Sequence, residues 1–153
     1  MAYGDNAATV SVSATVLPNE IAKTLSGTVT MTPTDANDKW YYKLTSVSNS
    51  STDLIAGTFI DTNVGIDDDT AHTSVSTSDK VRFLFIKNVD DSNSVYVTFD
   101  AGTASSSLAQ AVTIGAGEVF FARLPNCTVA GIHAISSTST VNCIVAAILD
   151  DVA

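Results

Sequence analysis

Charged side chains are scarce in this sequence, and basic ones are the scarcest. Asp, Glu, Lys and Arg make up 15% of the 153 residues, with 7 basic against 16 acidic side chains and a formal net charge of -9. An acidic surface repels phosphate backbones and anionic lipids. The composition therefore excludes nucleic acid and membrane surfaces as expected partners. The apolar share of 45% also excludes a disordered chain.

Long hydrophobic runs are missing as well. No apolar stretch approaches the roughly 20 residues that a membrane-spanning helix needs. The first residues, MAYGDNAATV, lack a basic segment followed by an apolar one, which is the pattern of an export signal. We therefore expect the chain to be made in the cytoplasm and not to be exported.

Cysteine occurs only at Cys127 and Cys143, in two apolar segments on either side of the turn residues 136–139. If these segments form a hairpin, Cys127 faces the region of Ala147, and Cys143 faces the region of Gly131. At about 3.3 Å per residue, the resulting offset of about four residues is too long for a disulfide. We predict two buried free thiols, which suits a reducing cytoplasm.

Residues that commonly carry catalysis are few or unsuitably spaced. The two histidines, His72 and His133, lack the close paired spacing of zinc ligands. There is no Gly-x-Ser-x-Gly elbow of a serine hydrolase. Gly115-Ala116-Gly117 lies between two apolar segments and does not open a helix, so it is no phosphate loop. We predict a non-enzymatic protein with no catalytic residues and no cofactor.

What the sequence has in abundance is short segments of β-branched and aromatic residues between clusters of Asp, Asn, Ser and Gly. Their hydrophobic period is two or less, which indicates strands. We expect strands over residues 8–16, 27–32, 39–47, 54–61, 80–88, 94–100, 110–114, 117–124, 128–135 and 140–149. Residues 20–25 are expected to form a helical turn or a loop.

The spacing of these segments is typical of an antiparallel meander or Greek key. The sequence therefore predicts an all-β fold, an antiparallel β-sandwich of jelly-roll or Greek-key type. Residues 1–7, MAYGDNA, carry no hydrophobic period and are expected to form a short N-terminal arm. Residues 8–153 are expected to form a single sandwich domain.

The longest stretch with little strand character, Asn63–Asp79, is the main expected loop. Long loops in small domains are often functional, so Asp67 and His72 in this loop are candidate contact residues. The run Asp67, Asp68 and Asp69 offers oxygen ligands for calcium, but it lacks the alternation and the terminal glutamate of an EF-hand. A solvated acidic loop is the preferred interpretation, with calcium binding as the alternative.

The aromatic pair Trp40 and Tyr41 has two interpretations. In a strand, such rings usually pack in a core or an interface, and Trp40 is the expected core anchor. Alternatively, the two rings form a platform for stacking on a sugar. This second possibility supports a carbohydrate-binding or host-adhesion module that also uses the acidic loop and calcium.

Several of the predicted strands are apolar on both faces. A two-layer sandwich has only one inner face per sheet to bury, so the surplus predicts a partner. Leu84, Ile86, Phe120 and Ile144 are the residues that we expect to be divided between the core and a subunit interface.

The succession VRFLFIKN, SVYVTFD, VTIGAGEVFFARL and TVNCIVAAILD resembles β-sandwich structural proteins of tailed phages, most closely head decoration or cement proteins. The resemblance covers about the second half of the chain. Its specific elements are the strand that ends in Ile86-Lys87-Asn88 and the Gly117-Glu118 turn before Val119-Phe120-Phe121. Baseplate, tail and fibre modules contain similar segments, so a tail or baseplate structural protein is an alternative.

The resemblance implies a homotrimer on the capsid exterior of a virion. Such a cement protein binds the major capsid protein of a tailed phage and bridges neighbouring subunits. A closed oligomer buries the second apolar face of its strands, and an acidic surface suits a shell whose DNA lies on the other side of the capsid wall. The family pattern carries no catalytic residue.

Overall fold

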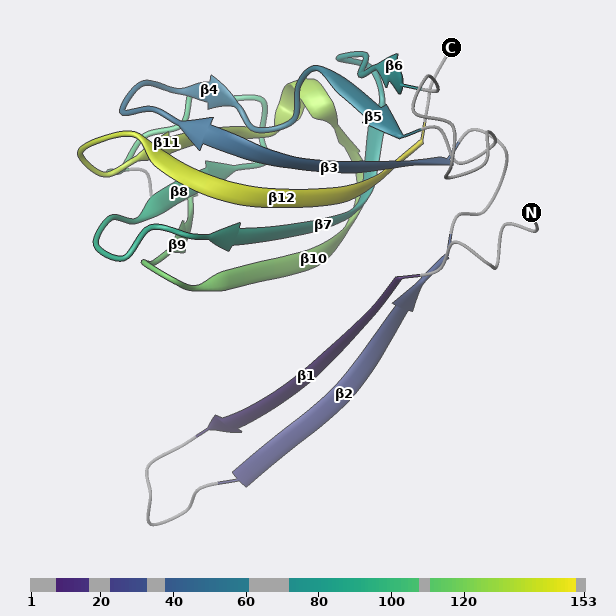
Figure 1. Ribbon diagram of the computed structural model, residues 1–153, viewed down its shortest axis with the longest axis vertical. Helices are drawn as coiled ribbons and strands as arrows, with labels where there is room; N and C mark the ends of the chain where they lie inside the picture. Colours follow the sequence, from purple (N-terminus) through teal and green to yellow (C-terminus); the bar gives the residue numbers. More distant parts are fainter. Residues whose placement is uncertain (1–7, 17–22, 33–37, 61–71, 108–110, 151–153) are drawn as a thin grey trace. The chain divides into compact units, whose positions relative to one another are not determined.

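Strands make up nearly all the regular structure of the described chain. The computed structural model describes residues 8–16, 23–32, 38–60, 72–107 and 111–150 (Figure 1). The prediction of an all-β fold built from antiparallel strands is confirmed. The chain divides into two compact units, residues 1–36 and residues 37–153. This division separates residues 8–36 from the remainder, whereas the sequence suggested one domain over residues 8–153.

The first unit contains a two-stranded antiparallel ribbon formed by β1 (Ala8–Val16) and β2 (Lys23–Met31). The strand expected over residues 8–16 is confirmed. The second strand begins earlier than expected, because its pairing with β1 continues without a bulge to Val16 opposite Lys23. Residues 23–25 are therefore strand, and the expected helical turn or loop is wrong there.

The second unit is a sandwich of two antiparallel sheets (Figure 1). Among the described residues, the larger sheet has six strands in the order β10-β7-β12-β3-β5-β6, and the smaller has four in the order β4-β11-β8-β9. The elements are β3 (Asp38–Val47), β4 (Thr52–Asp53), β5 (Thr58–Ile60), β6 (His72–Ser74), β7 (Lys80–Asn88), β8 (Val95–Thr98), β9 (Val112–Ile114), β10 (Val119–Thr128), the 3₁₀ turn η3 (Val129–Gly131), β11 (His133–Ser136) and β12 (Val141–Asp150). Sheet neighbours are mostly not consecutive in the chain, which excludes a simple meander.

The core lies between the two sheets and follows the alternation of their strands. On β12, every second residue from Val141 to Leu149 is buried against the opposite sheet. Leu84 and Ile86 of β7 lie beside Ala147 and Val145 in the same layer. The smaller sheet contributes the following buried side chains: Val95, Val97, Ile114 and Ala134. Burial of this apolar surface is the main stabilising contribution to the sandwich.

Two expectations about the last strands are wrong. Residues 128–135 do not form one strand, because η3 interrupts the extended backbone before β11. No hairpin brings Cys127 opposite Ala147, since β11 and β12 belong to different sheets and β12 pairs with β3 and β7. Both cysteines are nevertheless free, as predicted; Cys143 is also buried, whereas Cys127 is only partly buried.

The segment after β3 also differs from the expected single strand over residues 54–61. Leu54 and Ile55 follow β4 and precede β5 in the chain, and both are buried. The short strands β4 and β5 belong to different sheets. Gly57 follows with φ +95°, a conformation that glycine adopts without a steric penalty. The backbone therefore crosses from one layer to the other here. In the expected loop, residues 72–74 form β6, and residues 61–71 lie outside the described chain.

Asn88 is a buried polar side chain that joins three segments at the end of β7. Its Nδ2 donates hydrogen bonds to the carbonyl oxygens of Asn93 (2.7 Å), Gly115 (3.0 Å) and Ile114 (3.2 Å). Its Oδ1 accepts a hydrogen bond from the backbone N–H of Asp90 at 3.0 Å. One amide thus fixes the turn after β7 and the end of β9.

We expect the substitution Asn88→Ala to destabilise the sandwich by about 1–3 kcal/mol, because buried carbonyl groups lose their donor. Urea unfolding followed by tryptophan fluorescence measures this change. The matched control is Asn142→Ala, whose side chain is exposed and accepts only a surface hydrogen bond from Ser46. An equal loss of stability in the two variants contradicts the role given to Asn88.

Candidate functional site

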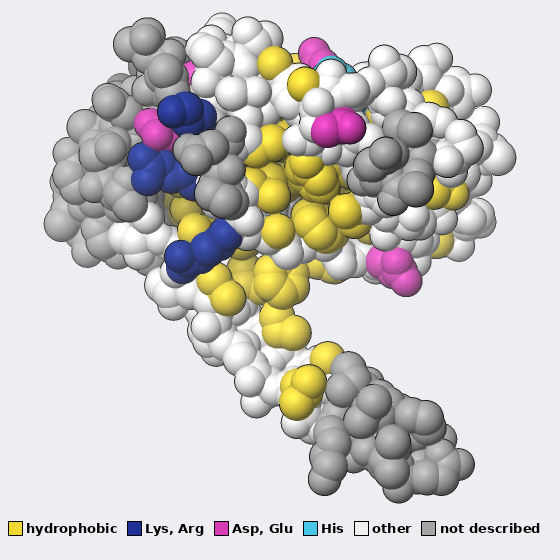
Figure 2. All heavy atoms as spheres, turned by 180° about the vertical axis from the view of Figure 1, so that it is seen from behind, with side chains coloured by type: hydrophobic (Ala, Val, Ile, Leu, Met, Phe, Trp, Pro, Cys, Tyr) yellow, Lys and Arg dark blue, Asp and Glu magenta, His cyan; other side chains and the backbone are white. Residues whose placement is uncertain are grey.

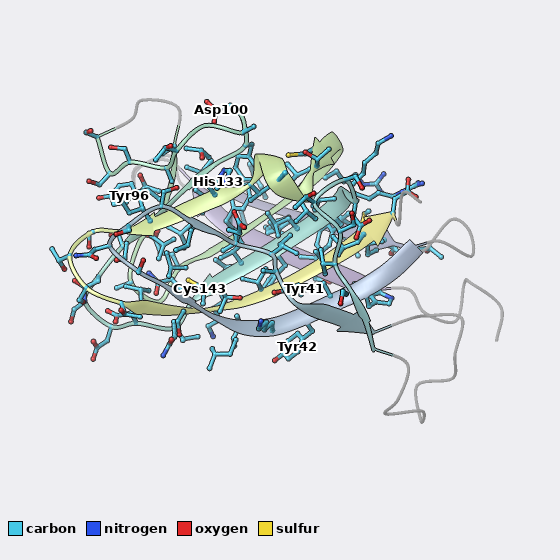
Figure 3. The ribbon with its side chains drawn as sticks, turned by 90° about the horizontal axis from the view of Figure 1, so that it is seen from above. Tyr41, Tyr42, Tyr96, Asp100, His133 and Cys143 are labelled. Atoms are coloured by element: carbon cyan, nitrogen blue, oxygen red, sulfur yellow. The ribbon has the colours of Figure 1, made fainter. Side chains whose placement is uncertain are left out.

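One side of the six-stranded sheet carries large apolar side chains although it faces away from the four-stranded sheet. We call this side the outer face. It consists of alternate residues of four adjacent strands: Trp40, Tyr42 and Leu44 of β3; Ile144, Ala146 and Ile148 of β12; Phe83, Phe85 and Lys87 of β7; Val119, Phe121 and Arg123 of β10. Figure 3 shows Tyr42 pointing away from the sandwich and Tyr41, its chain neighbour, pointing between the sheets.

The strand register aligns these side chains in three rows across the sheet. The rows are Arg123-Phe83-Ile148-Trp40, Phe121-Phe85-Ala146-Tyr42 and Val119-Lys87-Ile144-Leu44. Directly opposed side chains on neighbouring strands are about 5 Å apart at Cβ and contact each other. The outer face is therefore a mostly apolar surface, with two exposed cations, Arg123 in the first row and Lys87 in the third.

The second and third rows are more exposed than the centre of the first row. Phe83 and Ile148 in the first row retain 2% and 1% of their accessible surface. Tyr42 in the second row is 67% exposed, and Leu44 and Val119 in the third are 58% and 48% exposed. The second and third rows are consequently the part of the outer face that is available to a partner.

Polar groups border the outer face next to the third row. Ser46 donates a hydrogen bond to Oδ1 of Asn142 at 2.8 Å on the exposed surface, and Lys87 is exposed within the row. Protein interfaces typically combine an aromatic and aliphatic centre with a polar rim. Next to the third row, the outer face has such a polar border.

Apolar surface is not confined to this side of the molecule. Figure 2, the view from behind Figure 1, shows hydrophobic side chains reaching the surface, with Lys and Arg side chains gathered to the left of them. Exposed apolar atoms are normal on a soluble protein. The outer face differs because it holds three of the five large hydrophobic residues that are most exposed in the described chain: Tyr42, Leu44 and Val119, the others being Leu25 and Val89.

The structure places the sequence-predicted interface residues on both sides of the larger sheet. Leu84 and Ile86 are fully buried in the core, and Phe120 packs against the core with its ring centroid 5.8 Å from that of Phe99. Ile144 lies on the outer face and is partly exposed. Sequence reasoning missed the outer-face phenylalanines at 83, 85 and 121, which alternate with these residues. It also missed the most exposed members of the outer face: Tyr42, Leu44 and Val119.

The acidic-loop candidates Asp67, Asp68 and Asp69 lie outside the described residues. The backbone of His72 begins β6 and pairs with Ile60. Among the described residues, no group of three or more His, Cys, Asp or Glu side chains has a metal-binding arrangement. None of the described helices is long and apolar enough to span a membrane.

The suggestion that the rings of Trp40 and Tyr41 together form a sugar-stacking platform is wrong. The two side chains lie on opposite sides of β3, as successive residues of a strand must. Tyr41 is fully buried, and its hydroxyl donates a hydrogen bond to the carbonyl oxygen of Ala56 at 3.2 Å. Tyr41 is therefore part of the core and offers no ring to a ligand. The expectation that Trp40 anchors the core is wrong, because Trp40 lies on the outer face of β3.

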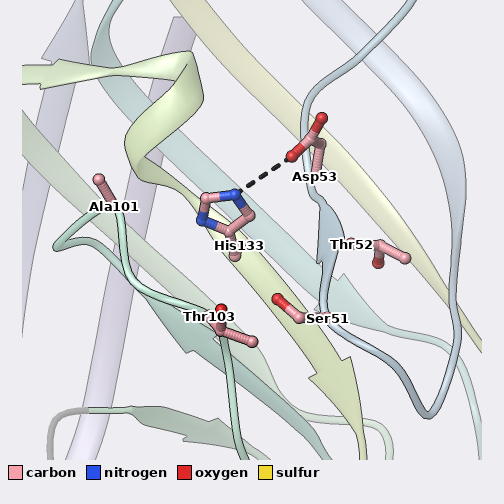
Figure 4. Close-up of a pocket in the computed structure, with 6 residues that line it drawn as sticks. All are labelled: Ser51, Thr52, Asp53, Ala101, Thr103 and His133. Atoms are coloured by element: carbon pink, nitrogen blue, oxygen red, sulfur yellow. Dashed lines mark ion pairs between the residues drawn. The ribbon is translucent and has the colours of Figure 1, made fainter.

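A polar pocket of about 520 Å³ lies at the other sheet, between β4, β11 and the segment after β8 (Figure 4). Its lining consists of Ser51, Thr52, Asp53, Ala101, Thr103 and His133. His133 Nε2 lies 3.3 Å from Asp53 Oδ1, while His133 Nδ1 is buried without a hydrogen-bond partner.

The pocket contains a serine, a histidine and an aspartate, but they are not connected as a catalytic relay. A relay requires the histidine to hydrogen-bond the serine. Here the Ser51 hydroxyl accepts a hydrogen bond from the backbone N–H of Ala104 at 2.9 Å. Asp53 and His133 are register partners on β4 and β11, so their contact holds the short edge strand β4 against the sheet.

The two thiols are poor nucleophiles in the folded protein. Burial, with a smaller contribution from the charge of Asp90, raises the pKa of Cys143 to about 11. Burial also raises the pKa of Cys127. Because the thiolate is the reactive form, both side chains are unsuited to catalysis near neutral pH.

Comparison with family models, curated proteins and solved structures finds no match to this chain. The outer face is the most developed candidate site of the described residues, and its chemistry is that of association.

We expect both thiols to react slowly with a disulfide reagent such as DTNB at pH 8 in the native protein. Cys127, which is partly exposed, should react first, and Cys143 should react only as the chain unfolds. Rapid reaction of both thiols in guanidinium chloride is the control. Native Cys143 reacting as fast as Cys127 contradicts the burial described above.

Proposed function

We propose that this chain is a non-enzymatic structural protein of a tailed-phage virion. In this proposal it is a capsid decoration (cement) protein that binds the outer capsid surface as a homotrimer and stabilises the head by bridging major capsid subunits. The observation that carries the proposal is the outer face, a mostly apolar surface on which Tyr42, Leu44 and Val119 are exposed. It supports association as the working activity of the chain.

Covering the outer face stabilises a complex through the hydrophobic effect. Fully burying one Leu or Phe side chain contributes about 1.5–3 kcal/mol relative to leaving it exposed. Tyr42, Leu44 and Val119 are each about half exposed or more. Large exposed apolar patches with polar rims mark interaction sites in soluble proteins. A partner that covers these three residues therefore gains several favourable contacts at once.

The segments that carry the resemblance to phage structural proteins also build the outer face. VRFLFIKN supplies Phe83 and Phe85, EVFFARL supplies Val119 and Phe121, and the last strand supplies Ile144. The resemblance and the apolar surface thus coincide on the same strands. This coincidence supports a coat or cement role over an unrelated β-sandwich function.

We expect Tyr42→Asp and Leu44→Asp to dissociate the oligomer without unfolding the sandwich, because both side chains already contact water in the single chain. Sedimentation velocity at micromolar concentration should show a trimer for the unmodified protein and a monomer for each variant. The matched control is Thr113→Asp on β9, an exposed strand residue of the other sheet. Circular dichroism checks that each variant is folded.

A purified chain that is monomeric at all concentrations contradicts the trimer. Binding to undecorated capsids tests the cement role separately: the unmodified protein should add to the capsids and raise the temperature at which they break. Labelling of intact virions with an antibody should mark the head. A label confined to the tail shows instead a tail or baseplate component.

A further inference from the structure

The polar pocket of Figure 4 lies on the outward side of the four-stranded sheet. Asp53, His133 and Thr98 are directly opposed on β4, β11 and β8. The next pair along β8 and β11, Val97 and Ala134, is buried in the core. Because successive residues of a strand face opposite sides, Asp53 and His133 point away from the core. The pocket and the outer face therefore lie on opposite sides of the sandwich.

The segment after β8, residues 99–104, forms one wall of the pocket and is held in place by hydrogen bonds. They run from Ala101 N–H to the carbonyl oxygen of Gly131 (3.1 Å), from the Thr98 hydroxyl to the carbonyl oxygen of Gly102 (3.3 Å), and from Ala104 N–H to Ser51 Oγ (2.9 Å). A wall fixed in this way is ready for a ligand, which does not have to order it on binding.

Two energetically unfavourable features coincide in this pocket. Ala101 has a φ of 61° and is the only non-glycine residue of the described chain with a positive φ. Such strained backbone conformations cluster at sites that clamp ligands. His133 Nδ1 is buried without a hydrogen-bond partner, and an unpaired buried polar atom is likewise uncommon away from functional sites. The pocket is therefore the part of this sheet at which binding is most strongly indicated.

The lining excludes several classes of ligand. None of its described residues is Lys or Arg, the side chains that bind phosphate and carboxylate groups. Ala101 supplies its only purely aliphatic side chain, so an apolar ligand finds little to contact. The described residues form no group of three or more metal-ligating side chains. Anions, lipids and metal ions are therefore poor candidates.

The groups that the lining does offer suit hydroxyl groups. The side chain of Asp53 is 61% exposed, and its contact with His133 uses only Oδ1, so the carboxylate has room to accept further hydrogen bonds. Ser51 Oγ accepts from Ala104, which leaves its own hydrogen to donate, and Thr103 adds an exposed hydroxyl. A ligand whose hydroxyls both donate and accept, such as a neutral sugar, matches this mixture. The volume of about 520 Å³ is within the usual range for a small-molecule site.

An aromatic ring flanks the pocket on the same side of the sheet. Tyr96 precedes Thr98 by two residues on β8, so it shares the outward side and is the diagonal neighbour of His133. Its side chain is partly exposed. Figure 3 shows Tyr96 and His133 on one side of the sandwich and Tyr42 on the other. The ring gives the pocket an apolar margin beside its hydrogen-bonding groups, and a sugar has both C–H and O–H groups to place there.

We propose that this pocket binds a neutral saccharide. Asp53 accepts hydrogen bonds from the sugar hydroxyls, Ser51 and Thr103 donate hydrogen bonds to it, and the ring of Tyr96 contacts its C–H groups. Because the outer face is on the opposite side of the sandwich, the chain can associate and bind a sugar at the same time. Sugar binding is thus a further activity that does not depend on the proposed virion role.

Titration of the isotope-labelled full chain with glucose, galactose, mannose and N-acetylglucosamine, followed through amide chemical shifts, tests this site. At least one of these sugars should shift the amides of residues 51–53, 101–103 and 133. Asp53→Asn should weaken the binding roughly tenfold or more, because hydrogen bonds to a charged acceptor are stronger than those to a neutral one. The matched control is Asp91→Asn, which removes an exposed carboxylate outside the lining and should leave the binding unchanged.

Thr103→Val removes one exposed hydroxyl at nearly constant volume and should also weaken the binding, so the result does not depend on the folding of Asp53→Asn alone. Methylammonium and inorganic phosphate are titrated in parallel. Three results overturn the proposal: no shift of these amides with any of the four sugars, shifts with methylammonium or phosphate but not with a sugar, or equal weakening by Asp53→Asn and Asp91→Asn. None of these variants alters the outer face, so failure here leaves the proposal of association standing.

Discussion

The pairing of β12 with strands on both sides is the constraint on which the rest of the sandwich depends. Along its whole length β12 pairs with β3, and over most of it with β7, so it lies at the centre of the larger sheet. Its odd-numbered residues from Val141 to Leu149 fill the core, while Ile144, Ala146 and Ile148 face the other way. A central strand with apolar residues on both sides supplies two surfaces that exclude water, and only one of them is covered by the smaller sheet. The outer face is therefore centred on β12, and residues of the neighbouring strands extend it.

Register, more than composition, makes the outer face continuous. Phe85 pairs with Ala146 on one side and Phe121 on the other, and Ala146 pairs with Tyr42. Because side chains alternate with a period of two, a shift of one residue in any strand exchanges its inner and outer sets. Such a shift in β7 moves Leu84 out of the core and an aromatic ring into it. The packing of the core therefore also fixes the position of every aromatic ring on the surface.

The sequence predicted most of the strands, the free thiols and the surplus of apolar surface, because these depend on local pattern. It did not predict which residues face outward. In a strand with one polar side, alternation identifies the buried side, but KVRFLFIKN is apolar at almost every position. Pairing with β12 and packing against the opposite sheet decide whether Leu84 or Phe85 faces the core. The residues of these elements lie far away in the chain. The expected hairpin around residues 136–139 failed for the same reason: adjacent segments were assumed to pair, whereas β12 pairs with β3 across about a hundred residues.

The charges on the outer face bear on the symmetry of an oligomer. The twelve residues of the outer face include Lys87 and Arg123 and no acidic side chain, in a chain with 16 acidic and 7 basic residues. An isologous contact brings the same patch of two copies together, so it places cations near cations. A heterologous contact sets the outer face against a different surface of the neighbour, in a chain whose acidic residues outnumber its basic ones. Heterologous contacts close into rings when the rotation between copies allows it. The electrostatics of the outer face therefore favour contact with an acidic surface over contact with the same face of a second copy.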